Sequence, residues 1–173
     1  MTRSLHLSLV AATLALGTTL FGSVARADGG DTVRWQAVNG IVAAGNVVGT
    51  GTGASTGGPT PWSTLDGHAR VDLARGRFDF EVRGLVLAGG NAIGTPGAVT
   101  QVKGTLVCDT DGSASGGNSV LVDTPLVELS ERGDARFEGT LGPLPASCTS
   151  EPDMAFLVRV AAGKWIANGS VLR

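Results

Sequence analysis

The sequence has few of the side chains on which enzymes most often depend. It holds two histidines and two cysteines in 173 residues. Of the two histidines, only His68 lies beyond the N-terminal segment that is expected to be removed. A Ser-His-Asp triad would need His68 as its base, and no G-x-S-x-G motif is present to position a serine. One histidine without a C-x-x-C pair also falls short of the usual zinc ligands. The sequence therefore contains no convergent catalytic set, and we predict no cofactor.

Basic residues are scarce and scattered. The chain has 13 Lys and Arg residues against 15 Asp and Glu residues, and only Lys103 and Lys164 are lysines. Without Arg3 and Arg26, which precede the expected mature chain, 11 basic residues remain and the net charge is about −4. Binding to a phosphate backbone needs clustered Lys and Arg residues. We therefore predict that nucleic acid is not a partner.

The N-terminal segment has the pattern of an export signal. Arg3 gives it a positive start, residues 5–24 are mostly apolar, and Ala25-Arg26-Ala27 is a small-x-small cleavage motif. We expect residues 1–27 to be a signal peptide, with an uncleaved membrane anchor as the alternative. Residues 28–173 would then be a single β domain, secreted or periplasmic and without a membrane span. The preference for arginine over lysine suggests a bacterial source.

Two cysteines in an exported chain favour a disulfide. Cys108 and Cys148 are the only thiols, and thiols are oxidised outside the cytoplasm. Their bond would close a loop of about 40 residues, for which chain entropy gives roughly 4 kcal/mol of stabilisation. We expect this disulfide to be a main contribution to stability.

Strand signals dominate the mature sequence. Glycine accounts for 27 of the 173 residues, and no long segment keeps the apolar period of a helix. Val, Thr and Phe alternate with polar residues between glycine-rich turns, which is typical of short antiparallel strands. Each such strand must bury its apolar face against another sheet. We predict an all-β, antiparallel β-sandwich of about eight to nine short strands with one disulfide, with a small closed β-barrel as the alternative.

One hairpin can be examined by its register. With Arg75-Gly76 as a two-residue turn, Val71 falls opposite Phe80 and one face becomes apolar. On the other face the same register sets Asp72 opposite Asp79, a like-charge contact. Most glycosidases use two neighbouring carboxylates as their catalytic residues, so this pair supports a carboxylate-dependent extracellular hydrolase as an alternative function.

Three further hairpins are expected at turns that contain glycine. Glu131-Arg132-Gly133 would join the strands on either side of it, with Gly133 at positive φ. A turn at Ala162-Gly163 would set Val158 opposite Ala167. Asn39-Gly40 is the strongest short turn signal in the chain and predicts a hairpin between the first two strands.

Trp62 is the candidate ligand-binding residue. It follows residues 49–61, a Gly/Thr-rich segment that we interpret as a flexible loop too poor in apolar residues to join the core. Exposed aromatic rings are common platforms for ligands, whereas Trp165 lies in a strand pattern and is expected in the core. Simple packing of Trp62 against the loop is the alternative.

Asp109-Thr110-Asp111-Gly112 is superficially similar to the start of a calcium-binding loop. Oxygen ligands at alternate positions before a glycine suit calcium, which makes Asp109 and Asp111 the candidate metal ligands. The pattern lacks a third oxygen ligand before Gly112 and the final Glu. We therefore expect a passive connecting loop and no bound metal.

The predicted function follows from a β-sheet domain whose sequence contains no convergent set of catalytic residues. We predict an exported, non-catalytic β domain that binds a component of the cell envelope or a partner protein, whose identity the sequence does not indicate. The carboxylate-dependent hydrolase is the alternative.

Overall fold

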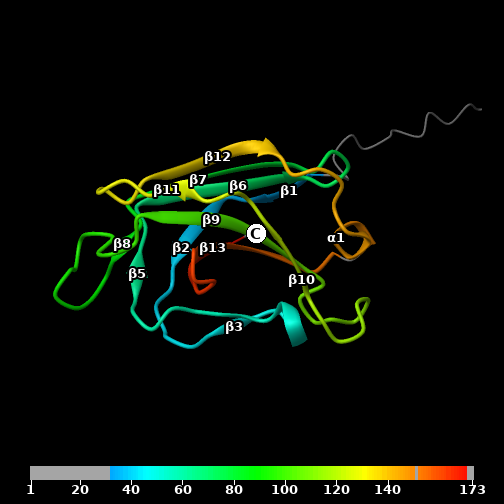
Figure 1. Cartoon of the computed structure of the whole chain (residues 1–173), viewed down its shortest axis with the longest axis horizontal. Helices are drawn as coiled ribbons and strands as arrows, with labels where there is room; N and C mark the ends of the chain where they lie inside the picture. The colour runs from blue at the N-terminus through cyan, green and yellow to red at the C-terminus, as the bar shows by residue number, and fades with distance from the viewer. Residues whose placement is uncertain (1–31, 151, 171–173) are drawn as a thin grey trace, which may run out of the picture.

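The computed structural model describes residues 32–150 and 152–170, and Figure 1 shows two stacked layers of strands. The predicted signal peptide, residues 1–27, lies outside the described residues. The upper layer is a four-stranded antiparallel sheet. Its strands, in spatial order, are β1 (Thr32–Trp35), β6 (Asp66–Asp72), β7 (Arg77–Arg83) and β12 (Ala135–Thr140).

The second layer is a six-stranded antiparallel sheet. Its main path is β10 (Val120–Asp123), β9 (Gln101–Cys108), β13 (Met154–Val160), β14 (Trp165–Ser170) and β2 (Ala37–Gly40), and β11 (Val127–Glu128) also pairs with β9. Both large sheets are open, so the fold is a sandwich and not a closed barrel. The described ranges hold fourteen strands, nine of which have four residues or more, against the eight or nine short strands expected.

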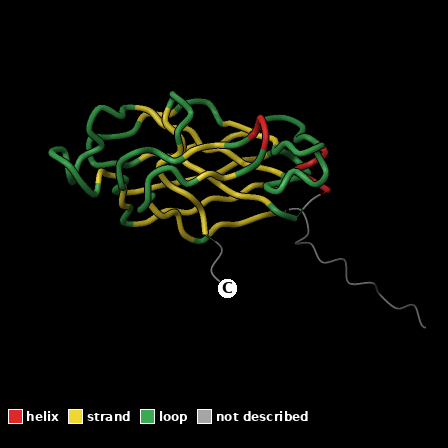
Figure 2. The backbone as a smooth tube through the Cα atoms, turned by 90° about the horizontal axis from the view of Figure 1, so that it is seen from below, coloured by secondary structure: helices red, strands yellow, loops and turns green. Residues whose placement is uncertain are grey.

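Short elements complete the fold outside the two large sheets, and Figure 2 shows loops at both ends and along one long side of the molecule. They are β3 (Val47–Val48) paired with β4 (Ser55–Thr56), β5 (Trp62–Ser63) paired with β8 (Val86–Leu87), the 3₁₀ turn η1 (Gly51–Gly53) and the helix α1 (Ala146–Ser150). No helix in the part of the chain that the structure describes is long and apolar enough to cross a membrane.

Three phenylalanines join the two sheets. Phe78 and Phe80 point inward from β7, and their ring centroids lie 6.0 and 5.7 Å from that of Phe156 on β13. All three side chains are fully buried. Gly104 on β9 makes room for them, because a Cβ at this position would lie 2.7 Å from the ring of Phe80. Large rings opposite a residue without a side chain are an efficient way to fill the space between sheets.

The first predicted hairpin has the expected faces but the wrong register. Val71 lies opposite Phe78 rather than Phe80, and residues 73–76 form a four-residue turn. Asp72 causes the shift because its carboxylate accepts the backbone N–H of Arg75 at 2.9 Å, a hydrogen bond that favours a longer turn. Asp72 therefore lies opposite Arg77, and the predicted contact between two aspartates does not occur.

Two expected hairpins are wrong because their strands belong to different sheets. The strands β11 and β12 flank the turn at Gly133, which has the predicted positive φ of 81°, but β11 pairs with β9 and β12 pairs with β7. In the same way β1 pairs with β6 of the first sheet and β2 pairs with β14 of the second, and Asn39-Gly40 lies within β2. Both sheets bury their apolar faces in one core, so alternation indicates the buried face without indicating the partner strand.

The hairpin expected at Ala162-Gly163 is confirmed at its centre. Val158 of β13 lies opposite Ala167 of β14, as the turn at Ala162-Gly163 predicts. A bulge after Val158 then places Trp165 opposite Arg159. Trp165 is a core residue, as expected, and is 4% exposed.

The Gly/Thr-rich segment at residues 49–61 is packed against the second sheet, which corrects its interpretation as a loop that stays outside the core. Gly58 donates its backbone N–H to the carbonyl oxygen of Trp165 at 2.8 Å, and the indole N–H of Trp165 donates to the carbonyl of Ser55 at 3.1 Å. Small residues allow this close approach of backbone to backbone. The segment is held against the second sheet by hydrogen bonds, and the pattern of hydrophobic residues in a sequence does not indicate such bonds.

The predicted disulfide is confirmed. Cys108 ends β9 and Cys148 lies in α1, with 4.8 Å between their Cα atoms. Both half-cystines are fully buried. The bond ties the short helix and its loops to the second sheet.

Candidate functional site

The outer face of the four-stranded sheet carries the charged side chains of its strands. Arg34 of β1 lies opposite Arg70 of β6, Arg70 lies opposite Asp79 of β7, and Asp79 lies opposite Glu138 of β12. One row across the upper layer of Figure 1 therefore reads Arg, Arg, Asp, Glu from β1 to β12. The positive end of this row is on the edge strand β1.

Each of the five carboxylates on these four strands has a basic partner. The closest contacts join Asp66 and Glu81 to Arg83, Asp72 to Arg75, Asp79 to His68, and Glu138 to Arg77 and Arg136. Most of these contacts are hydrogen-bonded ion pairs, whereas Asp79 Oδ1 lies 3.5 Å from His68 Nε2, an ion pair only when the imidazole is protonated. The negative charges of the face are therefore largely compensated within the fold.

Hydrogen bonds to arginine fix the charge of three of these acids. The side chain of Arg83 lowers the pKa of Asp66, and the side chain of Arg75 lowers the pKa of Asp72. In the same way the hydrogen bond from Arg77 lowers the pKa of Glu138. These carboxyl groups are ionised at neutral pH and are poor proton donors there.

Arg34 and Arg70 differ from the other charged residues of the face. Their side chains are exposed, and within residues 32–150 and 152–170 neither guanidinium forms an ion pair or a hydrogen bond. Two shallow hollows of about 250 and 370 Å³ lie on either side of the pair, and both are lined by Arg34, Arg70 and Asp79. The two arginines of the face that form no ion pair among the described residues thus lie beside two concave surfaces.

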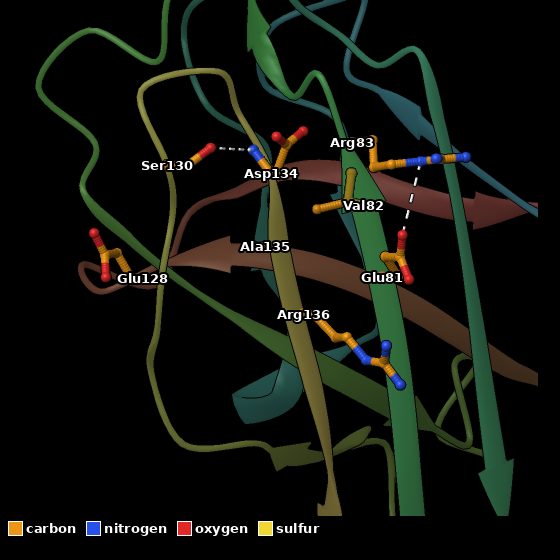
Figure 3. Close-up of a pocket in the computed structure, with 8 residues that line it drawn as sticks. All are labelled: Glu81, Val82, Arg83, Glu128, Ser130, Asp134, Ala135 and Arg136. Carbon is orange, nitrogen blue, oxygen red and sulfur yellow. Dashed lines mark hydrogen bonds and ion pairs between the residues drawn. The ribbon is translucent and has the colours of Figure 1, made fainter.

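A larger hollow of about 520 Å³ lies at the opposite edge of the sheet (Figure 3). Glu81, Arg83 and Arg136 point to one side of the strands there, and Glu128 lies on the other side of β12. The first three form ion pairs within the face, with Arg83 Nε 3.7 Å from Glu81 Oε1 and Arg136 bound to Glu138. This hollow has space for a ligand, but the lining charges that form no ion pair within the described residues are those of Glu128 and Asp134, which would repel an anionic ligand.

Comparisons of the chain with models of protein families, with curated proteins and with solved structures find no match. Function is therefore inferred from the site alone. The corrected register weakens the hydrolase alternative, because Asp72 and Asp79 do not face each other and lie opposite Arg77 and Arg70. A hydrolase of that kind needs one carboxyl group with a raised pKa, whereas the pKa of Asp72 is lowered.

The calcium candidates Asp109 and Asp111 lie in one cluster with a third carboxylate, Asp153. One carboxylate oxygen from each residue lies within 4.8 Å of the others. Asp109 is fully buried and accepts the backbone N–H of Ala114 at 3.1 Å, and Asp153 accepts the hydroxyl of Thr110 at 2.9 Å. These hydrogen bonds hold the loop together. Calcium takes six to eight oxygens, so three side chains would supply only part of a shell.

Trp62 lies in the core. Its side chain is 6% exposed, and the residue sits in β5 opposite Leu87. The carbonyl oxygen of Trp62 comes within 2.2 Å of the position that a Cβ on Gly40 would take, so β2 passes tightly against it. The exposed ring on which the ligand-binding prediction depends is not present.

Sequence reasoning missed Arg34 and Arg70 for a definable reason. Each is an ordinary exposed strand residue, and only the pairing of β1 with β6 sets them opposite each other. The predicted pairing of the first strand with the second conceals this relation. A search for like charges directly opposite each other on neighbouring strands would find the pair once the correct strand order was known.

Proposed function

We propose that the mature chain is an exported, non-catalytic β domain that binds a component of the cell envelope through the outer face of its four-stranded sheet. The observation that carries this proposal is the Arg34 and Arg70 pair, which is exposed and forms no ion pair within the described residues, on a face where the carboxylates have basic partners. Like charges directly opposite each other on neighbouring strands are unfavourable unless something else offsets them. A bound ligand is one such compensation.

Two further observations support the proposal. The disulfide between Cys108 and Cys148 suits an oxidising compartment outside the cytoplasm. The ion pairs on the proposed binding face keep Asp66 and Asp72 ionised, which suits recognition and opposes general acid catalysis.

Co-sedimentation with envelope fractions tests the proposal. The protein is expressed with its own N-terminal segment, recovered from outside the cytoplasm and mixed with washed bacterial envelopes. We expect the unmodified protein to sediment and the double variant Arg34→Glu, Arg70→Glu to remain in solution. The control is Arg132→Glu, Lys164→Glu, which makes the same change of charge at exposed positions outside the face. Equal sedimentation of both variants, or no sedimentation of the unmodified protein, would contradict the proposal.

A further inference from the structure

The Arg34 and Arg70 pair has the geometry of an oxyanion site. Directly opposite residues on antiparallel strands have Cβ atoms about 5 Å apart, so two guanidinium groups can reach one oxyanion from neighbouring strands. Planar guanidinium groups match carboxylate and phosphate oxygens with paired hydrogen bonds. Neither side chain is held by another residue of the described chain, so both are available to a ligand.

The rest of the face limits how much negative charge the ligand can carry. The four strands contain five arginines and five carboxylates, so their charge is balanced when His68 is neutral. A densely charged polymer or an anionic membrane would meet these carboxylates as well as the two free arginines. Repulsion from Asp79, which lies opposite Arg70, and from Glu138 would offset much of the attraction. The face therefore suits an isolated anionic group.

The neighbours of the pair suit a ligand rich in hydroxyl groups. Asp79 can accept hydrogen bonds from hydroxyls, and the exposed amide of Gln36 can donate and accept them. The large hydrophobic residues that are exposed among the described ones all lie outside β1, β6, β7 and β12; they are Val42, Val47, Leu65, Ile93 and Leu126. The face thus has hydrogen-bonding groups without an apolar anchor.

We propose that Arg34 and Arg70 bind the oxyanion of an acidic sugar within an otherwise neutral glycan. This inference rests on the proposed function and names its ligand class. The oxyanion is a carboxylate, as in a uronic acid, or a phosphate ester on a sugar. Both have the oxygens that guanidinium groups recognise.

Titrations followed by NMR chemical shifts test this inference with the full exported protein. The probes are glucuronic acid for the carboxylate, glucose 6-phosphate for the phosphate ester and glucose as the uncharged match. A hyaluronan tetrasaccharide, in which uronic acid alternates with a neutral sugar, represents the sparse acidic glycan. Heparin and vesicles of phosphatidylglycerol represent dense negative charge. We expect the tetrasaccharide and at least one acidic monosaccharide to bind, and glucose to bind at least about tenfold more weakly.

Variants locate the binding. Arg34→Gln and Arg70→Gln should each raise the Kd for the acidic probes about tenfold or more, since each removes charge-assisted hydrogen bonds. Arg132→Gln is the matched control and should leave the Kd unchanged, because Arg132 is exposed in a turn outside the face. Equal losses in all three variants would overturn the inference in favour of non-specific attraction. Tighter binding to heparin or to the vesicles than to the tetrasaccharide would also overturn it.

The two proposals fail in different ways. If the protein sediments with envelopes and the Arg34→Glu, Arg70→Glu variant does not, but the protein binds acidic and neutral probes equally or binds neither, the acidic-sugar inference is wrong and the binding face stands. If the protein neither sediments nor binds any probe, both proposals are wrong.

Discussion

The backbone of Leu85 lies directly over Gly133. The N–H of Leu85 donates to the carbonyl of Gly133 at 2.8 Å, and a Cβ on Gly133 would lie 2.4 Å from the carbonyl oxygen of Leu85. Gly133 also has a φ of 81°, where side chains are strained. We expect Gly133→Ala to lower the free energy of unfolding by more than about 2 kcal/mol, since steric overlap adds to the strain.

Gly90 provides the control for the effect of overlap. It has nearly the same φ, 82°, but no atom lies within 4 Å of its Cβ position. Gly90→Ala should therefore cost only the conformational strain, about 1 kcal/mol. Urea unfolding of both variants measures the difference. Equal losses in the two variants would contradict the close approach of Leu85.

Asp123 of β10 forms ion pairs with two basic residues of the second sheet. Lys103 and Arg159 lie opposite each other on β9 and β13, and both make ion pairs with Asp123, the second at 3.1 Å. Their side chains are 18% and 11% exposed, so Asp123→Asn would leave two partly buried like charges facing each other. We expect a loss of about 1 to 2 kcal/mol in the unfolding free energy, a range reduced because Asp123 is one-third exposed. Glu138→Gln, at an exposed pair, should change stability much less.

The contribution of Asp123 should depend on pH. Burial alone would raise the pKa of Asp123, but hydrogen bonds from Lys103 and Thr105 and the charge of Arg159 hold the pKa below its ordinary value. Because the pKa is lower in the folded protein, the stabilisation is present above the unfolded pKa and is lost as the pH falls through the folded pKa. The stability difference between the unmodified protein and Asp123→Asn should shrink below about pH 4. A difference that stays constant down to about pH 2 would contradict this assignment.

The disulfide gives a simple chemical test. Titration of the native protein with a thiol reagent should detect almost no free thiol, because Cys108 and Cys148 are bonded and buried. Replacing both cysteines with alanine should lower the free energy of unfolding by about 2 to 4 kcal/mol, since the bond closes a 40-residue separation. Two reactive thiols per chain in the native protein would refute the bond.

The fold class could be predicted from the sequence because alternation depends on burial, and burial is what the sandwich requires. The pairing of the strands could not be predicted in the same way, because a strand can bury the same alternating face in either sheet. Gly40 illustrates the difference: it resembles a turn glycine after Asn39, yet the close passage of Trp62 requires it within a strand. Asp72 illustrates a second obstacle to prediction. Its carboxylate accepts the backbone N–H of Arg75, which lengthens the turn and moves the register by two residues.

The site was less predictable than the fold because its residues are significant only as a pair. Arg34 and Arg70 are 36 positions apart and become neighbours through the pairing of β1 with β6. Asp109 and Asp111, in contrast, are close in the sequence and were candidates from their spacing, whereas Asp153 joins them only in the folded chain. The composition around Trp62 predicts an exposed ring, whereas the folded chain buries Trp62 in the hydrophobic core.

Asp109, Asp111 and Asp153 form the carboxylate cluster that could hold a metal ion. We expect calcium to have little effect on stability, because hydrogen bonds already engage each carboxylate. Asp111 accepts the backbone N–H of Ser113 at 2.9 Å, and hydrogen bonds from Ser113 lower the pKa of Asp111. Asp153 likewise accepts the backbone N–H of Asp111 at 3.1 Å. The loop therefore keeps its conformation through its own donors.

Thermal unfolding with and without calcium measures the effect directly. An ion bound only by the folded protein adds RT ln(1 + [L]/Kd), so millimolar calcium at a micromolar site would add about 4 kcal/mol. We expect less than about 0.5 kcal/mol. Asp153→Asn should lower the melting temperature equally with calcium and with EDTA, because its role is to accept hydrogen bonds. A rise of several degrees with calcium that Asp153→Asn abolishes would contradict this prediction, since only coordination by the carboxylate would make both changes occur together.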